Sequence, residues 1–409
     1  MVAADAFDLL DTASFADGHP HDAYDALRAD RPVFRHPGSD RQPPFWVLTR
    51  YDDVRAVSLD AQNFTSTKGF RVPTDQRAAM DPEIGRTLSR FMLAMDNPEH
   101  ADFRALVASA FMPGAIGRFE PRVEASVAGV MDTLAGRDEV EFVEEVGAIV
   151  PIRSICAIMG VPIEDEWRIF EFTNAVFGTD DPDYAPSLEV ANARYLAIFD
   201  YGLDLIEQRR REPRDDLISI IARAKVGGRS LDDIERKSFF SNMIAAGNET
   251  TRSSLAGALW GLWRFPDQRR RLVEDPSLIP AAVNELLRWH SPVFQMARTA
   301  TQDVEIGGVT IAAGERVAML YGAGNHDPAI FDDPHRVDVT RVNANRHLAF
   351  GYGVHHCLGL RLATMQLRHI LTAFLKTYPN YEVVEPPQFI RSNFVGAMKA
   401  LRIALGPTH

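Results

Sequence analysis

Cys357 has the clearest potential for chemistry, because a cysteine thiolate can act as a nucleophile or as a metal ligand. It lies in the stretch FGYGVHHCLG, which also contains Gly351, Gly353 and Gly359. Glycines let the backbone turn tightly around a sulfur atom and let a flat cofactor approach closely. The following residues, LGLRLATMQLRHILTAFLKTY, have an amphipathic helical pattern. We therefore expect Cys357 near a helix N-terminus, where free N–H groups and the helix dipole stabilise an anion.

The small number of cysteines limits which metal centre Cys357 could serve. The chain contains 2 cysteines, and the other, Cys156, lies in the apolar stretch VPIRSICAIMGVP, where we expect a small buried side chain. An iron–sulfur cluster or a cysteine-rich zinc site needs more thiolates, whereas a haem iron needs only one. A haem-bound thiolate is the favoured interpretation, and a structural cysteine beside a glycine-rich turn is the alternative.

A second group of reactive side chains lies in the segment AAGNETT, which runs from Ala245 to Thr251. Gly247 would leave room above the face of a haem, and the adjacent Glu249 and Thr250 offer a carboxylate and a hydroxyl that can relay protons. The Thr250 hydroxyl can also bond to a carbonyl of the preceding helical turn. The alternative is an ordinary helix segment in which the glycine makes a packing notch.

Two pairs of charged side chains have helical spacing. Glu285 and Arg288 are three residues apart and His100 and Arg104 are four apart, so each pair lies on one helix face. The first pair is weak evidence alone, because about two E-x-x-R matches are expected by chance in a chain this rich in Glu and Arg. For the second pair, a solvent-exposed helix face is one interpretation. The other is a site for a carboxylate-bearing cofactor, because buried anions require donors.

The elements that must position these residues are mainly helical. Helical patterns cover residues 98–111, 188–213 and 231–265, and we expect the last, which is unusually long, to run through the middle of the fold. Strand patterns are short and include RPVFRH, FWVLTR, NYEVVEPPQF and KALRIAL. A further hairpin with a Gly-Gly turn is predicted over 299–319. The predicted fold class is mostly α (α+β), with a small separate β region.

Together, the motifs resemble those of the cytochrome P-450 superfamily. Phe350, Gly353, Cys357 and Gly359 fit its pattern F-x-x-G-x-x-x-C-x-G, and His355 is at the usual basic position. The segment AAGNETT is similar to the oxygen-activation sequence of the family, and the order of the motifs also matches. The resemblance extends from FWVLTRYDDV to the C-terminal strands. It implies a cytochrome P-450 fold with a large helical region, a long central helix and a small β-rich region.

The resemblance also assigns roles to individual residues. It implies haem b as the cofactor, with Cys357 bound to the iron and with Glu249 and Thr250 helping to deliver protons to oxygen. The other expected haem contacts are His100, Arg104, Arg298 and His355, which would bind the propionates, and Phe350, Gly351, Gly359 and Ala246. The expected structural set is Glu285, Arg288 and Arg341. The expected substrate pocket comprises Ala245, Val293, Phe294, Met296 and Val395.

The activity implied by the resemblance is that of a haem-thiolate monooxygenase. Such an enzyme activates O2 and hydroxylates a small to medium hydrophobic substrate, here a terpenoid, alkyl-aromatic, fatty-acid-like or sterol-like compound. The chain has no nucleotide-binding, flavin or iron–sulfur motif, so electrons are expected from a 2Fe-2S or similar ferredoxin with an NAD(P)H-dependent reductase. Arg361 and Arg368 are candidates for its docking patch. The alternatives are a peroxide-driven haem-thiolate oxidase and a non-catalytic haem-binding sensor, and the intact Glu249 and Thr250 argue against both.

Length and charge set further limits. The chain has 409 residues, of which 46% are hydrophobic, and a formal net charge of -12. It can therefore bury a large core and has little non-specific attraction for nucleic acid or anionic membranes. We find neither a signal-peptide pattern at the N-terminus nor an apolar run long enough to span a bilayer. We expect a cytoplasmic monomer without a membrane anchor, in which residues 1–409 form one cytochrome P-450 domain.

Overall fold

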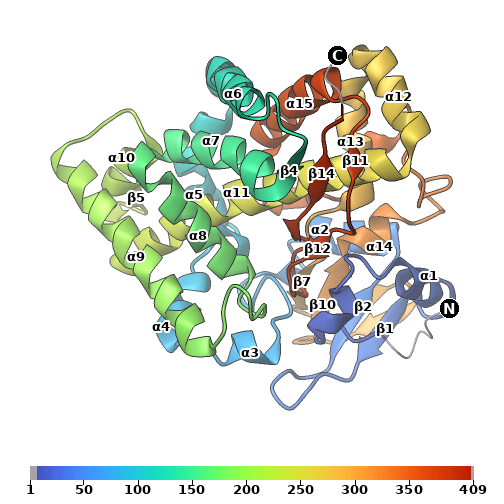
Figure 1. The fold of residues 1–409 in the computed structure, drawn as a ribbon. Helices are drawn as coiled ribbons and strands as arrows, with labels where there is room; N and C mark the ends of the chain where they lie inside the picture. The colour runs from blue at the N-terminus through green and yellow to red at the C-terminus, as the bar shows by residue number, and fades with distance from the viewer. Residues whose placement is uncertain (1–6, 407–409) are drawn as a thin grey trace.

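The computed structural model describes residues 7–406, and helices form the larger part of it (Figure 1). The helices are α1 (His21–Asp30), α2 (Tyr51–Leu59), α3 (Asp75–Ala78), α4 (Pro82–Leu88), α5 (Glu99–Ala108), α6 (Pro113–Thr133), α7 (Ile149–Met159), α8 (Glu166–Phe177), α9 (Leu188–Arg211), α10 (Leu217–Arg223), α11 (Asp233–Arg264), α12 (Pro266–Glu274), α13 (Ile279–His290), α14 (Tyr321–Asn325) and α15 (Leu360–Thr377). The strands are β1 (Val33–His36), β2 (Phe45–Leu48), β3 (Phe64–Thr65), β4 (Glu139–Glu141), β5 (Lys225–Val226), β6 (Arg229–Ser230), β7 (Gln295–Ala300), β8 (Val304–Ile306), β9 (Val309–Ile311), β10 (Arg316–Leu320), β11 (Glu382–Val383), β12 (Gln388–Phe389), β13 (Met398–Ala400) and β14 (Arg402–Ala404).

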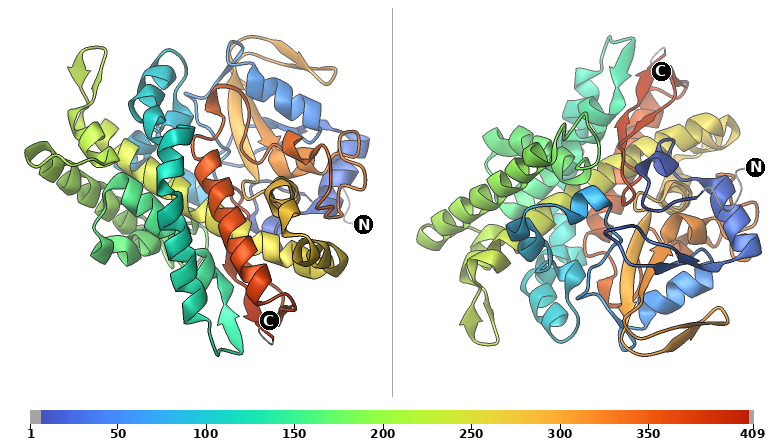
Figure 2. Two further views of the ribbon diagram at one scale, coloured as in Figure 1. Left: turned by 90° about the horizontal axis from the view of Figure 1, so that it is seen from above. Right: turned by 90° about the horizontal axis from the view of Figure 1, so that it is seen from below.

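The long helix α11 crosses the middle of the molecule (Figure 2). It has 32 residues and is therefore about 48 Å long. Asp232 caps its N-terminus in a capping box with Glu235. At the other end, α12 begins at Pro266, which has no N–H to continue a helical hydrogen-bond ladder. α11 packs against α7, α8, α9, α13 and α15, which confirms the predicted central position.

The β-rich region lies beside the helices and near the N-terminus (Figure 1). Its main sheet has the strand order β1-β2-β10-β7-β3, in which β10 and β2 are parallel and the other pairs are antiparallel. β8 and β9 form an antiparallel hairpin. Its turn residues Gly307 and Gly308 have φ angles of 57° and 82°, in the region that favours glycine. The predicted Gly-Gly hairpin is therefore confirmed.

Short strands near the C-terminus return the chain to the centre of the molecule. β11, β14 and β4 form one small antiparallel sheet, and β12 pairs with β13. In the turn between β12 and β13, Val395 forms an isolated bridge with Val293, which lies just before β7. The C-terminal turn therefore lies directly against the start of the main sheet.

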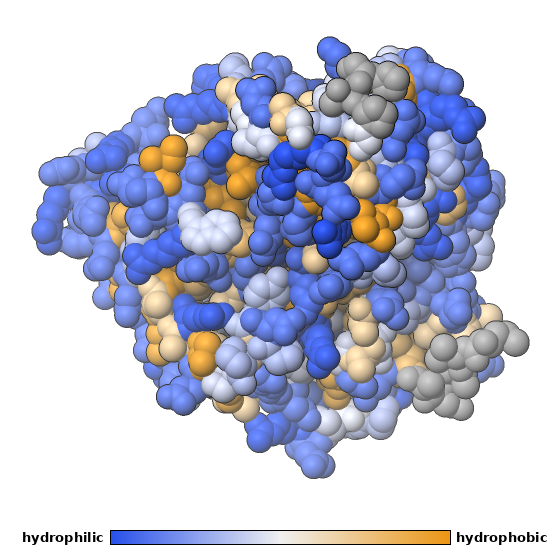
Figure 3. Space-filling model, in the orientation of Figure 1, coloured by the Kyte–Doolittle hydropathy of each residue, from blue (hydrophilic) through white to orange (hydrophobic). Residues whose placement is uncertain are grey.

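The elements together confirm the prediction of a mostly helical chain with a small β region. The face of the molecule in Figure 3 is mainly polar, with apolar side chains scattered among charged ones. Over residues 7–406, we find no helix with the length and apolar character needed to cross a membrane.

Candidate active site

The loop before α15 holds Cys357 in a turn that depends on glycine. The N–H group of Cys357 donates to the carbonyl of Phe350 over 2.9 Å. Gly351 and Gly353 have φ angles of 67° and 70°, where other L residues are strained. A Cβ at Gly353 would also lie 2.4 Å from the carbonyl oxygen of Ser58. Glycine at this position therefore fixes the path of the loop that presents the sulfur.

The Cys357 sulfur lies at the start of a helix. Burial raises the pKa of the thiol, whereas the backbone N–H groups of Gly359 and Leu360 and the guanidinium of Arg104 lower it. Gly359 is the N-cap of α15, so these N–H groups are among those that a helix leaves unpaired at its first turn. The donors do not fully offset burial. A metal cation would, because coordination deprotonates a thiol outright.

The centre of α11 and the first turn of α15 both border open space. On α11, Ala246 is exposed and Thr250 is half-buried, whereas most of the helix is buried. A Cβ at Gly247 would lie 2.8 Å from the side chain of Ile155 on α7. Gly247 is therefore a packing notch between two helices, which corrects the expectation that it leaves room for the cofactor. At Gly359, no atom lies within 4 Å of the position that a Cβ would occupy. A flat cofactor lying between these elements would cover surfaces that the described residues leave open.

Four nitrogen-bearing side chains gather beside the cysteine loop. The rings of His100 and His355 have centroids 4.4 Å apart, and Arg104 donates to the carbonyl of His356 over 2.8 Å. Within the described part of the chain, no carboxylate forms an ion pair with Arg104 or Arg298, and Nδ1 of His355 is buried without a hydrogen-bond partner. Burial and the neighbouring positive charges lower the pKa of His355 to about 2. Asp96 is close enough for its charge to act on His100 and Arg298, but it forms no ion pair with either. The carboxylates of a ligand would supply the counter-charges that the cluster still lacks.

Glu249 forms a buried ion pair within α11. Its partner is Arg252, one turn later, and both side chains are almost completely buried. Burial raises the pKa of Glu249, and Arg252 partly opposes this rise. The second carboxylate oxygen, Oε1, has no hydrogen-bond partner among residues 7–406. The adjacent Thr250 donates its hydroxyl proton to the carbonyl of Ala246 over 3.0 Å, and the helix continues through this position. The Thr250 hydroxyl therefore lies at the partly open face of the helix, whereas Glu249 is buried beside it.

Glu285 on α13 is the centre of a buried charge network. Arg288 donates two hydrogen bonds of 2.8 Å to its carboxylate. Arg341 donates to both carboxylate oxygens at 3.0 and 3.1 Å, and the N–H group of Asp338 donates at 2.9 Å. The network joins α13 to the segment that leads into the cysteine loop. The structure therefore places Arg288 and Arg341 on the same carboxylate, that of Glu285.

Four of the five residues predicted to line a substrate pocket lie in one region. Ala245 and Val395 belong to a large apolar cluster around the first half of α11. Val293 and Met296 are partly buried and pack against the same cluster. This arrangement gives the region beside the centre of α11 an apolar lining.

Phe294, the fifth of these residues, lies elsewhere and requires a correction. Its ring stacks on Phe15 at 4.6 Å, within the cluster that covers the N-terminal segment. Its N–H group donates to the carbonyl of Phe394, and its own carbonyl accepts from Tyr321. These bonds fix the backbone just before β7 with the ring turned toward the N-terminal segment. The pocket prediction is therefore reduced to the other four residues.

Two polar residues of the site were missed by the sequence interpretation. Ser66 places its hydroxyl 3.1 Å from Nε2 of His355, a contact across 289 residues for which the sequence gives no signal. Arg252, the partner of Glu249, had a signal in the i, i+3 spacing of ETTR. That spacing is the same as in the network of Glu285, so a second E-x-x-R match in this chain also forms a buried pair.

Comparisons with known proteins identify the family of this chain. The family model for cytochrome P450 matches residues 191–395. The chain is 34% identical over 391 residues to a methyl-branched lipid omega-hydroxylase of Mycobacterium tuberculosis, covering 93% of this chain and 90% of that protein. It is 32% identical over 395 residues to linalool 8-monooxygenase of Pseudomonas putida, covering 95% and 96%. A solved Mycobacterium marinum cytochrome P450 in complex with pseudoionone superposes with a TM-score of 0.91, at 34% identity and 98% coverage of both chains.

The chain belongs to the cytochrome P450 family, and its fold is the cytochrome P450 fold. It is a monooxygenase that uses haem b. The residues of this chain fit that cofactor on three counts. They supply a single thiolate at a helix N-terminus, an open space bordered by Gly359 and Ala246, and a cluster of donors in which neither Arg104 nor Arg298 has an ion-pair partner among residues 7–406.

Proposed function

We propose that this cytochrome P450 hydroxylates the methyl-branched end of a hydrophobic chain, with O2 and with electrons from a separate ferredoxin. The observation that carries the proposal is the exposed stretch of α11. Ala246 and Thr250 border open space, whereas the adjoining cluster around the helix is apolar. A substrate bound there would meet an apolar surface with one hydroxyl, that of Thr250.

In this proposal, Cys357 binds the haem iron. His100, Arg104, Arg298 and His355 would bind the two propionates, and this role is supported by the absence of an ion pair at either arginine within residues 7–406 and by the unpartnered Nδ1 of His355. Phe350, Gly351 and Gly359 would line the cysteine side of the cofactor, and Ala246 the opposite side. When bound, the haem supplies the oxidising chemistry, because a thiolate ligand favours cleavage of the O–O bond. The chain itself holds the cofactor, excludes water and positions protons.

Thr250 and Glu249 would be the catalytic residues of the chain. The Thr250 hydroxyl now donates to the carbonyl of Ala246, and it would exchange this bond for one with an acceptor in the open space. Glu249 would resupply the proton through its unpartnered oxygen Oε1, and burial raises the pKa of this carboxyl. Arg252 would keep the carboxylate at a fixed place on α11.

The names of similar proteins support the class of substrate. One relative is named an omega-hydroxylase of methyl-branched lipids, another a linalool monooxygenase, and the solved neighbour binds pseudoionone. Linalool and pseudoionone are isoprenoids, so their carbon chains also carry methyl branches. In this chain, an apolar surface that could contact a branched hydrocarbon chain is formed by Val293, Met296 and Val395. An isoprenoid or branched lipid chain is therefore the proposed substrate.

A surface for the ferredoxin is proposed on α6 and α15, which lie side by side (Figure 2). Arg368 on α15 is paired with Glu120 on α6. Arg361, two positions after the N-cap of α15, is exposed, and no ion pair joins it to a carboxylate within residues 7–406. An exposed, unpaired cation near the haem ligand suits an acidic electron donor, because charge complementarity steers association.

The activity can be tested by reconstitution. The purified haem protein is combined with a surrogate ferredoxin, its reductase and NAD(P)H, and is offered an acyclic isoprenoid, a methyl-branched fatty acid or an unbranched fatty acid of equal length. We expect substrate-dependent NAD(P)H consumption and a terminally hydroxylated product, by mass spectrometry, with the branched compounds. Equal or faster oxidation of the unbranched chain would contradict the substrate class. Turnover with peroxide alone, and none with the ferredoxin system, would favour the peroxide-driven alternative.

The ferredoxin surface has a matched pair of variants. Arg361→Glu should slow reduction by the ferredoxin on the order of tenfold at low salt, because it reverses a charge at the proposed contact. Arg223→Glu makes the same change at an exposed position at the end of α10 and should leave the rate unchanged. Stopped-flow reduction under carbon monoxide measures both. Equal rates for the two variants would refute this placement of the donor.

A further inference from the structure

Three histidines that are distant in the sequence meet outside the haem region. His21 is the first residue of α1, His326 directly follows α14, and His335 lies in the loop beyond it. Each offers a ring nitrogen, and these nitrogens all lie within 4.8 Å of one another. The ring centroids are 4.1 Å apart for His21 and His326 and 5.2 Å apart for the other two pairs. We call these three residues the histidine cluster.

Each ring of the histidine cluster has a nitrogen available for a ligand. Nδ1 of His326 lies 3.0 Å from the carbonyl oxygen of Gly322, so it must be the protonated nitrogen. Its Nε2 atom is buried and has no hydrogen-bond partner in the part of the chain that the structure describes. The same holds for Nδ1 of His21. In His335, Nε2 lies 2.7 Å from a carboxylate oxygen of Asp25, which leaves Nδ1 free.

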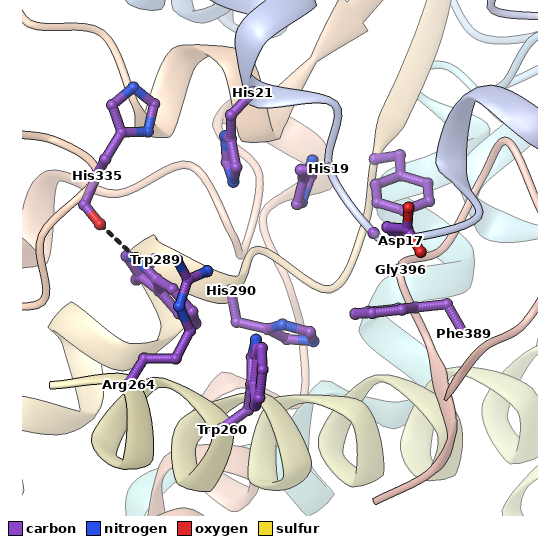
Figure 4. A pocket seen from close by; sticks show the side chains of 12 residues that line it. Asp17, His19, His21, Trp260, Arg264, Trp289, His290, His335, Phe389 and Gly396 are labelled. Carbon is purple, nitrogen blue, oxygen red and sulfur yellow. Dashed lines mark hydrogen bonds between the residues drawn. The ribbon is translucent and has the colours of Figure 1, made fainter. Parts of the chain in front are cut away.

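The partners of the cluster resemble the outer sphere of a metal site. A histidine that binds a metal usually donates its second N–H to a carboxylate or a backbone carbonyl, which fixes the ring and raises its basicity. Asp25 serves His335 in this way, and the carbonyl of Gly322 serves His326. The main chain of His335 is also fixed, because its carbonyl accepts a 2.8 Å hydrogen bond from the indole N–H of Trp289 (Figure 4).

The site is reachable and its charge balance is acceptable for a cation. The side chain of His335 is 44% exposed, and both His335 and His21 line a cavity of about 260 Å³ (Figure 4). Two arginines lie near the cluster, but Arg28 is paired with Asp25 and Arg288 with Glu285. Each of the two arginine charges near the cluster is therefore matched by a carboxylate, and one of these, Asp25, also contacts the ring of His335.

We propose that His21, His326 and His335 bind a divalent transition metal ion of the zinc class, which fixes the start of α1 to residues 326–335. Imidazole nitrogens suit Zn²⁺, Cu²⁺ and Ni²⁺, whereas Mg²⁺ and Ca²⁺ prefer oxygen ligands. Tetrahedral Zn²⁺ with bonds of about 2.1 Å places its ligands about 3.4 Å apart. The ring nitrogens, which lie within 4.8 Å of one another, would draw closer together around the ion, and the exposed His335 would move together with its partner Asp25. Water would occupy the fourth position.

The test uses tag-free, full-length holoenzyme that has been treated with a chelator and dialysed. Isothermal titration calorimetry with Zn²⁺ should show one equivalent bound, and His335→Ala should weaken this binding at least tenfold. The control is His369→Ala, because His369 with Glu120 and Glu124 is the other group of this kind found over residues 7–406. His369→Ala should leave the affinity for the tight equivalent unchanged. Mg²⁺ should not compete.

A second measurement guards against a purely structural effect of the substitution. Zn²⁺ should raise the melting temperature of the wild-type protein and of His369→Ala, because a ligand that binds only the folded state stabilises it. It should not raise the melting temperature of His335→Ala. Equal Zn²⁺ affinity in the wild type and His335→Ala, or loss of the tight site only in His369→Ala, would overturn the proposal. The proposal would also be overturned if Zn²⁺ still raised the melting temperature of His335→Ala.

Discussion

Thr250 and Glu249 are neighbours in the sequence, but their surroundings are opposite. The Thr250 side chain borders open space and satisfies its hydroxyl with the carbonyl of Ala246. Glu249 is fully buried, is paired on one oxygen with Arg252, and leaves Oε1 without a partner in the described chain. An unsatisfied buried polar atom costs about 1 to 3 kcal/mol, so packing alone would not favour it. The proposed role of Glu249 in proton transfer would account for its presence.

The first prediction concerns the Thr250 hydroxyl. Thr250→Ala should keep haem and fold, because the hydroxyl bonds only to a carbonyl that already belongs to the helix. The amount of hydroxylated product per NAD(P)H should fall on the order of tenfold, since positioned proton donors contribute roughly 10²-fold or more to rates. The lost electrons should appear as hydrogen peroxide, measured in the same assay.

Thr250→Ser is the matched control, because it retains a hydroxyl at the same atom position. It should recover most of the coupling between electrons and product. Unchanged coupling in Thr250→Ala would contradict a role for this hydroxyl, and equal losses in both variants would point to the methyl group instead.

Residue types and local spacing predicted part of the site and could not predict the rest. The cysteine loop could be recognised because its glycines and its thiol are local in sequence. The contact of Ser66 with His355 spans 289 residues, and no periodic pattern encodes such a contact. Phe294 was assigned to the pocket by position, but its ring is held by Phe15, 279 positions earlier. Side-chain direction at the start of a strand depends on such distant partners.

At the scale of elements, α13 and the segment after α14 are joined through Glu285. One carboxylate receives hydrogen bonds from Arg288, from Arg341 and from the backbone of Asp338. Arg288 continues the network to the carbonyls of Asn325 and Pro334. These contacts hold the chain that leads to the cysteine loop, so the position of the thiol depends on an element that does not touch it.

The second prediction compares two pairs with the same spacing. Glu285→Ala leaves Arg288 and Arg341 buried without a counter-ion, which should lower the free energy of unfolding by about 3 to 5 kcal/mol. Glu207→Ala removes the partner of Arg210, an i, i+3 pair on α9 whose side chains are 46% and 50% exposed. That change should cost less than about 0.5 kcal/mol. Denaturant titration of both variants, followed by haem absorbance, measures the difference.

Equal losses of stability in Glu285→Ala and Glu207→Ala would contradict the structural role of the network. Loss of haem at low denaturant in Glu285→Ala, before the helices melt, would support it further. This order is expected because the network holds the cysteine loop, whereas α11 is stabilised by its own apolar packing.

The elements themselves were easier to predict than the contacts between them. The pattern over 231–265 indicated the long helix, and the structure has it as α11, Asp233–Arg264. The Gly-Gly pair indicated the hairpin of β8 and β9 because both positions require positive φ. In contrast, the parallel pairing of β10 with β2 joins strands about 270 residues apart, and neither strand has a local feature that selects its partner.

At the scale of the whole molecule, buried histidines link stability to pH. Burial lowers the pKa of His19 and His347 to about 4 and that of His290 to about 3. The ordinary pKa of histidine is about 6.5, so the unfolded chain takes up protons first as the pH falls. The contribution of these histidines to the free energy of unfolding should therefore be fully present above about pH 6.5. It should be lost progressively as the pH falls toward about 4.

The third prediction follows from this linkage. Each such histidine should add about 1.4 kcal/mol per pH unit to the slope of stability against pH between about 6 and 4.5. His290→Gln removes one of them and retains a side chain that can bond to Ser253, the present partner of His290. The slope, from denaturant titrations at several pH values, should be shallower by that amount. Identical slopes in the variant and the wild type would contradict the assignment.

The central claim is that the thiolate of Cys357 binds the haem iron, and the chain offers a clean comparison because it has 2 cysteines. The measurement is the absorption spectrum of the reduced protein under carbon monoxide, in which thiolate ligation gives a band at distinctly longer wavelength than nitrogen ligation. The account predicts this band in the wild type and in Cys156→Ser, because Cys156 is buried in α7. It predicts that Cys357→His loses the band but retains some haem. Survival of the band in Cys357→His, or its loss in Cys156→Ser alone, would contradict the account.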